Sequence, residues 1–208
     1  MTTLQDFRPP LVAILRGLEA QRAVDVANVL FDAGFRIIEV PLNRPGALLC
    51  IQAISAAAPA DALVGGGTML TRADVDNVRA AGGRLMVSPN CNAAVIQHAV
   101  SVGMLTAPGI ATATEAFAAL DAGAHALKLF PAETLGIAGM KALLSVLPPG
   151  TPVWPVGGVT PQSMWPWVRA GATGFGIGSQ LFQPGKSLVD VAATAREFIA
   201  AWVDATAG

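Results

Sequence analysis

Residues 112–130 read Thr-Ala-Thr-Glu-Ala-Phe-Ala-Ala-Leu-Asp-Ala-Gly-Ala-His-Ala-Leu-Lys-Leu-Phe, and this stretch contains one complete unit of the fold. Thr112 followed by Glu115 is the signature of a capped helix start. The Ala-rich segment then ends at Gly123, as helices do when a glycine follows the last turn. The next run, 124–130, is short and mostly apolar, which is typical of a parallel strand covered on both faces. The stretch therefore predicts a helix followed by a buried strand.

The same unit recurs along the chain about every 20 to 27 residues. Glycines close four more Ala-rich segments, at Gly34, Gly82, Gly103 and Gly171. Two other helices are expected to stop near Pro59 and at 148–150, and residues 187–206 supply an eighth. Apolar runs that predict strands occupy 12–16, 36–40, 62–66, 84–88, 104–107, 124–130, 152–156 and 174–177.

Eight strands alternating with eight helices predict an α/β protein with a (β/α)₈ TIM barrel. A doubly wound parallel sheet is the alternative. The barrel is favoured because the first strand leads into Ile14-Leu-Arg-Gly17 and not into a Gly-x-Gly-x-x-Gly phosphate motif. No shift in composition marks a linker, so residues 1–208 are expected to form a single domain.

Composition excludes several classes of partner. The 208 residues are 53% hydrophobic and 13% charged, with a net charge of -1. Without a basic cluster, neither nucleic acid nor a membrane surface is an expected partner. The chain start lacks the charged and apolar blocks of a signal peptide, and no apolar stretch reaches transmembrane length, so a cytoplasmic location is expected. A small molecule is the expected partner.

Metal and disulfide chemistry are also disfavoured. Cys50 and Cys91 have no metal-like spacing and are expected to be free thiols. No His, Asp or Glu cluster has the spacing of metal ligands, so no metal or other cofactor is expected.

In a barrel of this type the functional residues follow the carboxyl ends of the strands. Polar residues, prolines or glycines stand at all eight positions: Arg16, Glu39, Thr68, Ser88-Pro89, Pro108-Gly109, Lys128, Gly157-Gly158 and Gly178-Ser179. Period-two alternation places Glu39 with Ile37, and Lys128 with Ala126 and Phe130, on the strand faces that point inward. Both charged groups are therefore expected in the barrel mouth.

Lys128 is the candidate nucleophile. A buried ammonium is costly, so its amine is expected to be neutral, as attack on a ketone requires. Glu39 would then move protons during formation and breakdown of a Schiff base, directly or through water. A plain buried ion pair between the two is the structural alternative.

Two glycine turns and two polar side chains are candidate anion sites. Gly157-Gly158 and Gly178-Ser179 follow the last two predicted strands, where many barrels bind phosphate, and Ser179 adds a hydroxyl donor. Tight turns are the alternative interpretation. Arg16 and Thr68 are candidates for binding a carboxylate, although a solvated charge also accounts for Arg16.

Other polar residues have structural interpretations. Glu115 and Asp74 are expected to cap helices. His125, at the start of a predicted strand, and His98, on a helix, are expected at the barrel bottom or on the surface.

Seven ordered blocks resemble those of the class I 2-keto-3-deoxy-6-phosphosugar aldolases across essentially the whole chain. These blocks are Ala13-Ile-Leu-Arg-Gly17, Ile38-Glu-Val-Pro-Leu-Asn43, Gly65-Gly-Gly-Thr68, Ser88-Pro-Asn90, Pro108-Gly-Ile-Ala-Thr-Ala-Thr-Glu-Ala-Phe117, Ala126-Leu-Lys-Leu-Phe-Pro131 and Val156-Gly-Gly-Val-Thr-Pro161.

The resemblance assigns roles to several residues. It implies that Lys128 is the Schiff-base lysine and Glu39 the general acid/base. The substrate-binding residues expected with them are Arg16, Thr68, Pro89, Phe130, Gly157, Gly158, Gly178 and Ser179, with Gly157, Gly158 and Ser179 at the phosphate.

The resemblance further implies a (β/α)₈ barrel, a cytoplasmic homotrimer, and metal-free cleavage of a phosphosugar acid to pyruvate and D-glyceraldehyde 3-phosphate. The chain is most similar to the branch that acts on 2-dehydro-3-deoxy-6-phosphogalactonate. The sister branch, acting on the C4-epimeric phosphogluconate sugar, has Glu-Val-Thr-Leu-Arg-Thr where this chain has Glu39-Val-Pro-Leu-Asn-Arg44, and lacks the arginine matched by Arg16.

Several alternatives stay open on the sequence. The sister activity, activity on both epimers, and substrate contact by Arg44 as well as Arg16 are each compatible with these residues. A non-catalytic phosphosugar-binding barrel, or a phosphate-binding isomerase or synthase, would use the glycine turns without an imine.

Overall fold

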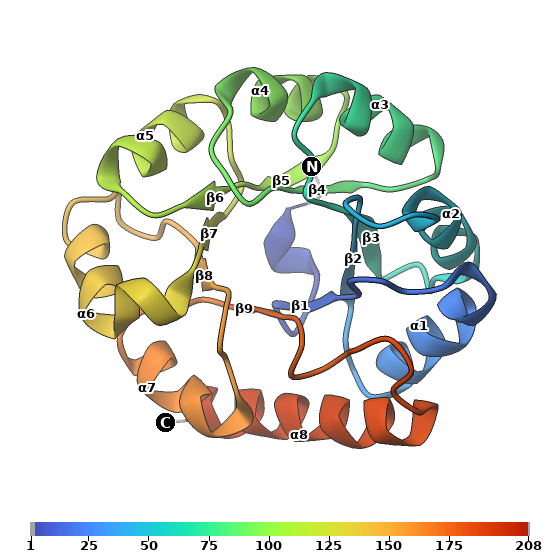
Figure 1. Ribbon diagram of the computed structural model, residues 1–208. Coiled ribbons are helices and arrows are strands. Elements are labelled where there is room, and N and C mark those ends of the chain that lie inside the picture. Colours follow the sequence, from blue (N-terminus) through green and yellow to red (C-terminus); the bar gives the residue numbers. More distant parts are fainter. Residues whose placement is uncertain (1–2, 208) are drawn as a thin grey trace.

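A computed structural model describes residues 3–207 as a ring of parallel strands with helices outside it (Figure 1). The strands are β1 Leu11–Ile14, β2 Ile37–Pro41, β3 Leu63–Gly67, β4 Leu85–Val87, β5 Leu105–Ala107, β6 Gly109–Ile110, β7 Leu127–Leu129, β8 Val153–Pro155 and β9 Phe175–Ile177. The helices are α1 Ala23–Asp32, α2 Ala47–Ala57, α3 Arg72–Ala80, α4 Ala93–Ser101, α5 Ala113–Asp121, α6 Ala132–Leu144, α7 Met164–Arg169 and α8 Leu188–Thr206, with 3₁₀ turns η1 Leu4–Asp6, η2 Ala20–Arg22 and η3 Pro161–Ser163.

The strands form two parallel sheets, whereas the sequence predicted one closed sheet. Their orders are β5-β4-β3-β2-β1-β9 and β6-β7-β8. A single bridge between Val156 and Gly176 links the chain after β8 to β9. Between β5 and β6 only Pro108 intervenes, and its carbonyl accepts a hydrogen bond from the Lys128 amide at 2.9 Å. The predicted α/β class with parallel strands and eight α-helices is confirmed.

Strand alternation separates two apolar cores. Ile37 and Leu63 point inward, into a cluster enclosed by the strands. Ile38 and Val40 belong to the larger cluster between the strands and the helices. Because helices cover only the outer side of the ring (Figure 1), the arrangement is not that of a doubly wound sheet, which carries helices on both faces.

The amino-terminal segment enters the ring from the end where the strands begin. Leu4 and Phe7 are buried in the inner cluster, and η1 lies inside the ring in Figure 1. The Arg84 guanidinium lies 6.0 Å from the centroid of the Phe7 ring. This segment closes one end of the inner cluster, so the opposite end, at the carboxyl ends of the strands, is left for a site.

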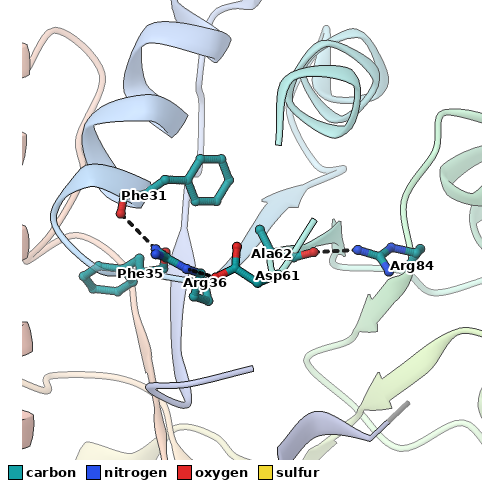
Figure 2. Close-up of polar contacts among 6 residues, drawn as sticks. All are labelled: Phe31, Phe35, Arg36, Asp61, Ala62 and Arg84. Carbon is teal, nitrogen blue, oxygen red and sulfur yellow. Dashed lines mark hydrogen bonds and ion pairs between the residues drawn. The ribbon is translucent and has the colours of Figure 1, made fainter. Parts of the chain in front are cut away.

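Two arginines fasten the starts of neighbouring strands (Figure 2). Arg36 Nη1 donates to the carbonyl oxygens of Phe31 (2.9 Å) and Phe35 (2.8 Å), which joins the end of α1 to the start of β2. Its Nε donates to the Asp61 carboxylate at 2.8 Å. Arg84 Nη2 donates to the Ala62 carbonyl at 2.5 Å, next to the start of β3.

No helix among residues 3–207 is long and apolar enough to cross a membrane.

Candidate active site

A cavity of about 300 Å³ opens at the carboxyl ends of the strands. Nine of the ten predicted site residues line it: Arg16, Thr68, Pro89, Lys128, Phe130, Gly157, Gly158, Gly178 and Ser179. The tenth, Glu39, lies below them and shares a smaller inner cavity with Lys128. Residues from β1 to β9 thus meet at one end of the ring, as their positions after the strands predicted.

Lys128 and Glu39 face each other inside the ring. The distance from Lys128 Nζ to Glu39 Oε1 is 3.7 Å. Lys128 is 8% exposed and Glu39 only 1%. Position 128 on β7 and position 39 on β2 are separated by 89 residues in sequence, so alternation on two distant strands brings the amine and the carboxyl together.

Burial dominates the protonation of both groups. It lowers the pKa of Lys128 from its ordinary value of 10.5, and the nearby Arg16 charge lowers it further while Glu39 opposes the shift. Burial also raises the pKa of Glu39 above 4.5, although the charges of Lys128 and Arg16 oppose this. Both shifts favour the uncharged forms, because a low-dielectric interior penalises charge. A neutral amine is the form that attacks a carbonyl carbon.

The second carboxyl oxygen of Glu39 has an unusual environment. Oε2 is buried and accepts no hydrogen bond from any residue between 3 and 207. A Cβ atom at Gly67 would lie 1.3 Å from Oε2, so only glycine at position 67 is compatible with this position of the carboxyl. The inner cavity beside Glu39 and Lys128 is about 10 Å³, close to the size that holds one water. The carboxyl is therefore placed to exchange a proton with the amine or through a water.

An aromatic ring borders the amine. Lys128 Nζ lies 5.2 Å from the centroid of the Phe130 ring, and both residues line the main cavity. The apolar ring limits access of water to the amine, which adds to the desolvation that keeps it neutral.

Backbone N–H groups gather at the loops after β8 and β9. In the described part of the chain, no hydrogen bond to a protein acceptor is found for the amides of Gly158, Ser179 and Gln180. Gly157 has a φ of 115°, and a Cβ there would also lie 1.8 Å from the Glu133 carboxylate, so this position requires glycine. Unpaired amides on two adjacent loops form the kind of concave surface that binds phosphate.

The carboxylate-binding candidates lie across the same cavity. Thr68 has a φ of 55°, a left-handed conformation that β-branched residues rarely adopt. Backbone strain of this kind concentrates at functional sites. Arg16 lines the main cavity with Thr68, whereas Arg44 lines a separate surface groove with Asp74 and Asn77. Arg16 therefore shares a cavity with Lys128, and Arg44 does not.

The residues predicted to have structural roles have them. Thr71 with Asp74 and Thr112 with Glu115 form reciprocal capping boxes at the starts of α3 and α5. His98 pairs with Asp76 at 2.8 Å on the surface. His125 accepts a hydrogen bond from the Thr106 amide on Nδ1 at 3.2 Å, at the end of the ring opposite the cavity.

Sequence reasoning missed the far wall of the cavity. Gln180, Phe182, Gln183 and Pro184 line it, from the loop between β9 and α8. The signal that could have found them is their place directly after the last strand, because the loops after the strands build the site in such barrels.

Among residues 3–207 no group of three or more His, Cys, Asp and Glu side chains could hold a metal ion.

The chain matches known proteins over nearly its full length. The family model "KDPG and KHG aldolase" matches residues 6–195. The chain is 45% identical over 196 residues to the 2-dehydro-3-deoxy-6-phosphogalactonate aldolase of Escherichia coli K12, covering 94% of this chain and 96% of that one.

Solved structures agree with these matches. A structure described as native KDPGal superposes with a TM-score of 0.95 at 44% identity, covering 97% of this chain and 98% of the other. The KDPG aldolase of Legionella pneumophila, described with pyruvate captured as a covalent carbinolamine intermediate, superposes with a TM-score of 0.78 at 25% identity, covering 91% and 93%. The family match spans more than half of the chain and agrees with the buried lysine and carboxyl in the cavity. The chain belongs to the KDPG and KHG aldolase family.

Proposed function

We propose that this protein is a class I aldolase that reversibly cleaves 2-dehydro-3-deoxy-6-phospho-D-galactonate to pyruvate and D-glyceraldehyde 3-phosphate. The observation that carries the proposal is the buried Lys128 amine 3.7 Å from the Glu39 carboxyl, at the floor of a cavity walled by unpaired backbone amides. The 45% identical relative named for this activity supports the choice of substrate.

The reaction begins at Lys128. The neutral amine attacks the C2 ketone, and Glu39 supplies the proton that the resulting alkoxide needs. Loss of water from the carbinolamine leaves a protonated imine between Lys128 and the substrate. The Legionella relative, described with a carbinolamine, supports this route.

Cleavage follows when the C4 hydroxyl loses its proton to Glu39, directly or through a water in the small inner cavity. The C3–C4 bond breaks, its electrons pass to the imine as an enamine, and D-glyceraldehyde 3-phosphate leaves. Protonation of the enamine at C3 and hydrolysis of the imine release pyruvate and restore Lys128. The same carboxyl thus accepts and returns protons at successive steps, for which a raised pKa is suited.

The remaining site residues hold the two ends of the substrate. Arg16 and Thr68 are proposed to bind the C1 carboxylate, the former through its planar donor fork. Gly157, Gly158, Gly178 and Ser179 are proposed to bind the 6-phosphate. Pro89 and Phe130 supply the apolar wall around the imine.

For the whole protein, we propose one domain whose two sheets close into a (β/α)₈ barrel through the Val156–Gly176 bridge and the Pro108 carbonyl. We further propose a cytoplasmic homotrimer that needs no metal. Exposed Leu48, Leu49 and Leu70, around the α2 and α3 starts, support an interface between copies, because large apolar side chains on one face favour association.

The test is release of pyruvate, measured with a coupled lactate dehydrogenase assay, from the two C4 epimers at equal concentration. We expect at least about tenfold higher kcat/KM for the galactonate epimer, because placed polar contacts reject an inverted hydroxyl. Equal values would make the enzyme bifunctional, and a reversed preference would make it the gluconate enzyme. No pyruvate from either sugar would refute an aldolase and favour a phosphosugar-binding protein.

Activity should survive a chelator, and its loss would refute the metal-free mechanism.

A further inference from the structure

In the loop between β9 and α8, residues 178–187, the first carbonyl groups accept hydrogen bonds from other residues of the same loop. The Gly178 carbonyl accepts from the amides of Leu181 (2.9 Å) and Phe182 (3.0 Å). The Ser179 carbonyl accepts from Gln183 Nε2 at 3.1 Å. With these carbonyls engaged, the unpaired amides of Ser179 and Gln180 are the backbone groups left for an anion in the cavity that both residues line.

The next two carbonyls of the loop are held by one ammonium. Lys186 Nζ donates to the Leu181 carbonyl at 2.9 Å and lies 3.5 Å from the Gln180 carbonyl. It also donates to Thr194 Oγ1 at 2.8 Å, on α8. The Thr194 hydroxyl donates its own proton to the Asp190 carbonyl at 2.9 Å, so its oxygen is oriented to accept from Lys186. The half-buried ammonium therefore has three acceptors and a defined position.

Two contacts connect this loop to the loop that carries Arg16. Arg22 Nη2 donates to the Lys186 carbonyl at 2.5 Å. A Cβ at Gly17 would lie 3.0 Å from Pro184 Cγ, so the two loops are already in close contact. The loop of residues 178–187 is thus braced against both α8 and the loop after β1.

We infer that Lys186 is a positioning residue for phosphate binding. Its ammonium holds the carbonyls of Gln180 and Leu181, and the same two peptides carry the Leu181 and Phe182 N–H groups that bind the Gly178 carbonyl. Lys186 thereby fixes the Gly178–Ser179 peptide in the orientation that presents the Ser179 N–H to the phosphate. The inference rests on the proposed function, since it assumes a phosphorylated substrate. It does not place Lys186 in contact with the substrate. If the Gly178–Ser179 peptide turned so that the Gly178 carbonyl faced the cavity, that carbonyl would repel the anion that the Ser179 N–H otherwise binds.

The experiment compares Lys186→Met with Lys141→Met. Both variants remove one positive charge, but Lys141 is exposed on α6 and takes no part in the hydrogen bonds described above for this loop. For Lys186→Met we expect the KM for D-glyceraldehyde 3-phosphate in the condensation direction, and the inhibition constant of inorganic phosphate, to rise about tenfold, as for lost hydrogen bonds to a charged group. Half-saturation by pyruvate in borohydride trapping should stay within about twofold, because pyruvate does not reach the loop. Lys141→Met should match the wild type in every measurement.

A second variant keeps the charge and removes one of the three acceptors of the Lys186 ammonium. Thr194→Val should raise the phosphate inhibition constant about threefold, a smaller loss because the two carbonyls still hold the ammonium. This variant also decides the matter if Lys186→Met does not fold. Phosphate inhibition unchanged in both variants, or pyruvate half-saturation rising in parallel with it, would overturn the inference. Failure of wild-type protein to trap pyruvate at all would instead refute the proposed aldolase.

Discussion

At the scale of single residues, the position of Glu39 depends on the absence of a side chain at residue 67. Replacing Gly67 by Ala puts a methyl group 1.3 Å from the present site of Oε2, so the carboxyl must leave its present position beside Lys128. We expect turnover of Gly67→Ala to fall about 10²-fold, since a displacement of about 1 Å in a catalytic group has effects of that size. Steady-state kcat with the galactonate epimer is the measurement.

Two comparison variants show whether displacement of Glu39 causes the expected loss of turnover in Gly67→Ala. Glu39→Gln should lose about 10²- to 10⁴-fold in kcat. Adding Gly67→Ala to it should then cost little more, because the group that the methyl displaces no longer acts. Gly139→Ala, on α6, meets only an ordinary 3.4 Å contact with Leu135 and should leave kcat unchanged. Wild-type turnover in Gly67→Ala would contradict a proton-transfer role for Glu39 in its present position.

The lowered pKa of Lys128 predicts the pH dependence of catalysis. Only the neutral amine attacks the ketone, so kcat/KM should rise with pH while Lys128 loses its proton and then level off. Because the pKa lies below 10.5, the plateau should begin well below that pH. A plot of log kcat/KM that still climbed by one unit per pH unit near pH 10 would show an ordinary, solvated lysine.

The sequence predicted the central pair but not its surroundings. Alternation on two strands was enough to aim Glu39 and Lys128 inward. The room that Gly67 leaves, and the strained φ of Thr68, arise from contacts with neighbouring strands, which a single sequence does not contain. The same holds for Arg16 and Arg44, because only the folded arrangement shows that Arg16 lines the cavity and that Arg44 lines a separate groove.

At the scale of elements, local signals predicted best. The predicted caps Glu115, with Thr112, and Asp74, with Thr71, stand at the starts of α5 and α3 as the sequence indicates, because each cap is a contact within four residues. Thr160 caps the 3₁₀ turn η3, which precedes α7. The short strand β6 was missed, since two residues carry no periodic signal.

The contacts of Arg36 make a prediction about the junction of α1, β2 and β3 (Figure 2). Arg36→Met leaves the partly buried carbonyls of Phe31 and Phe35 without this donor. We expect the free energy of unfolding, measured with urea, to fall by about 1 to 3 kcal/mol. Asp61→Asn should change the free energy of unfolding far less, because the Asp61 carboxylate is exposed to solvent. Equal losses in both variants would show that the exposed ion pair, and not the carbonyl contacts, holds the junction.

At the scale of the whole molecule, the site and the stability of the fold are opposed. Burial lowers the pKa of Lys128 below its unfolded value of 10.5 and raises the pKa of Glu39 above its unfolded value of 4.5. The lysine shift costs free energy of folding at pH values below 10.5, and the glutamic acid shift costs free energy of folding at pH values above 4.5. Both shifts therefore oppose folding between these two values.

Removing the pair should therefore stabilise the protein while abolishing activity. We expect Lys128→Met with Glu39→Met to raise the free energy of unfolding at pH 7 by about 1 to 4 kcal/mol, as when buried ion pairs elsewhere are replaced by apolar chains. Lys128→Met alone should be less stable than the double variant, because it leaves the carboxyl buried without its partner. A double variant less stable than wild type would mean that the pair holds the ring together.

The repeating unit predicted the alternation of strands and helices. It did not predict the amino-terminal segment inside the ring or the break into two sheets. The segment with Leu4 and Phe7 enters the ring by packing against strand starts that are far away in sequence, and no local pattern marks it. The break into two sheets likewise depends on backbone registers around Pro108 and Val156. Contacts of this range depend on the whole chain, whereas helices and strands are specified locally.

The most direct test of the account is reduction of the protein with sodium borohydride in the presence of pyruvate, followed by peptide mass spectrometry. The account predicts loss of activity and a reduced pyruvyl adduct on Lys128, with no adduct on Lys141 or Lys186 and none in Lys128→Met. An active preparation in which Lys128 stayed unmodified, or in which another lysine carried the adduct, would contradict it.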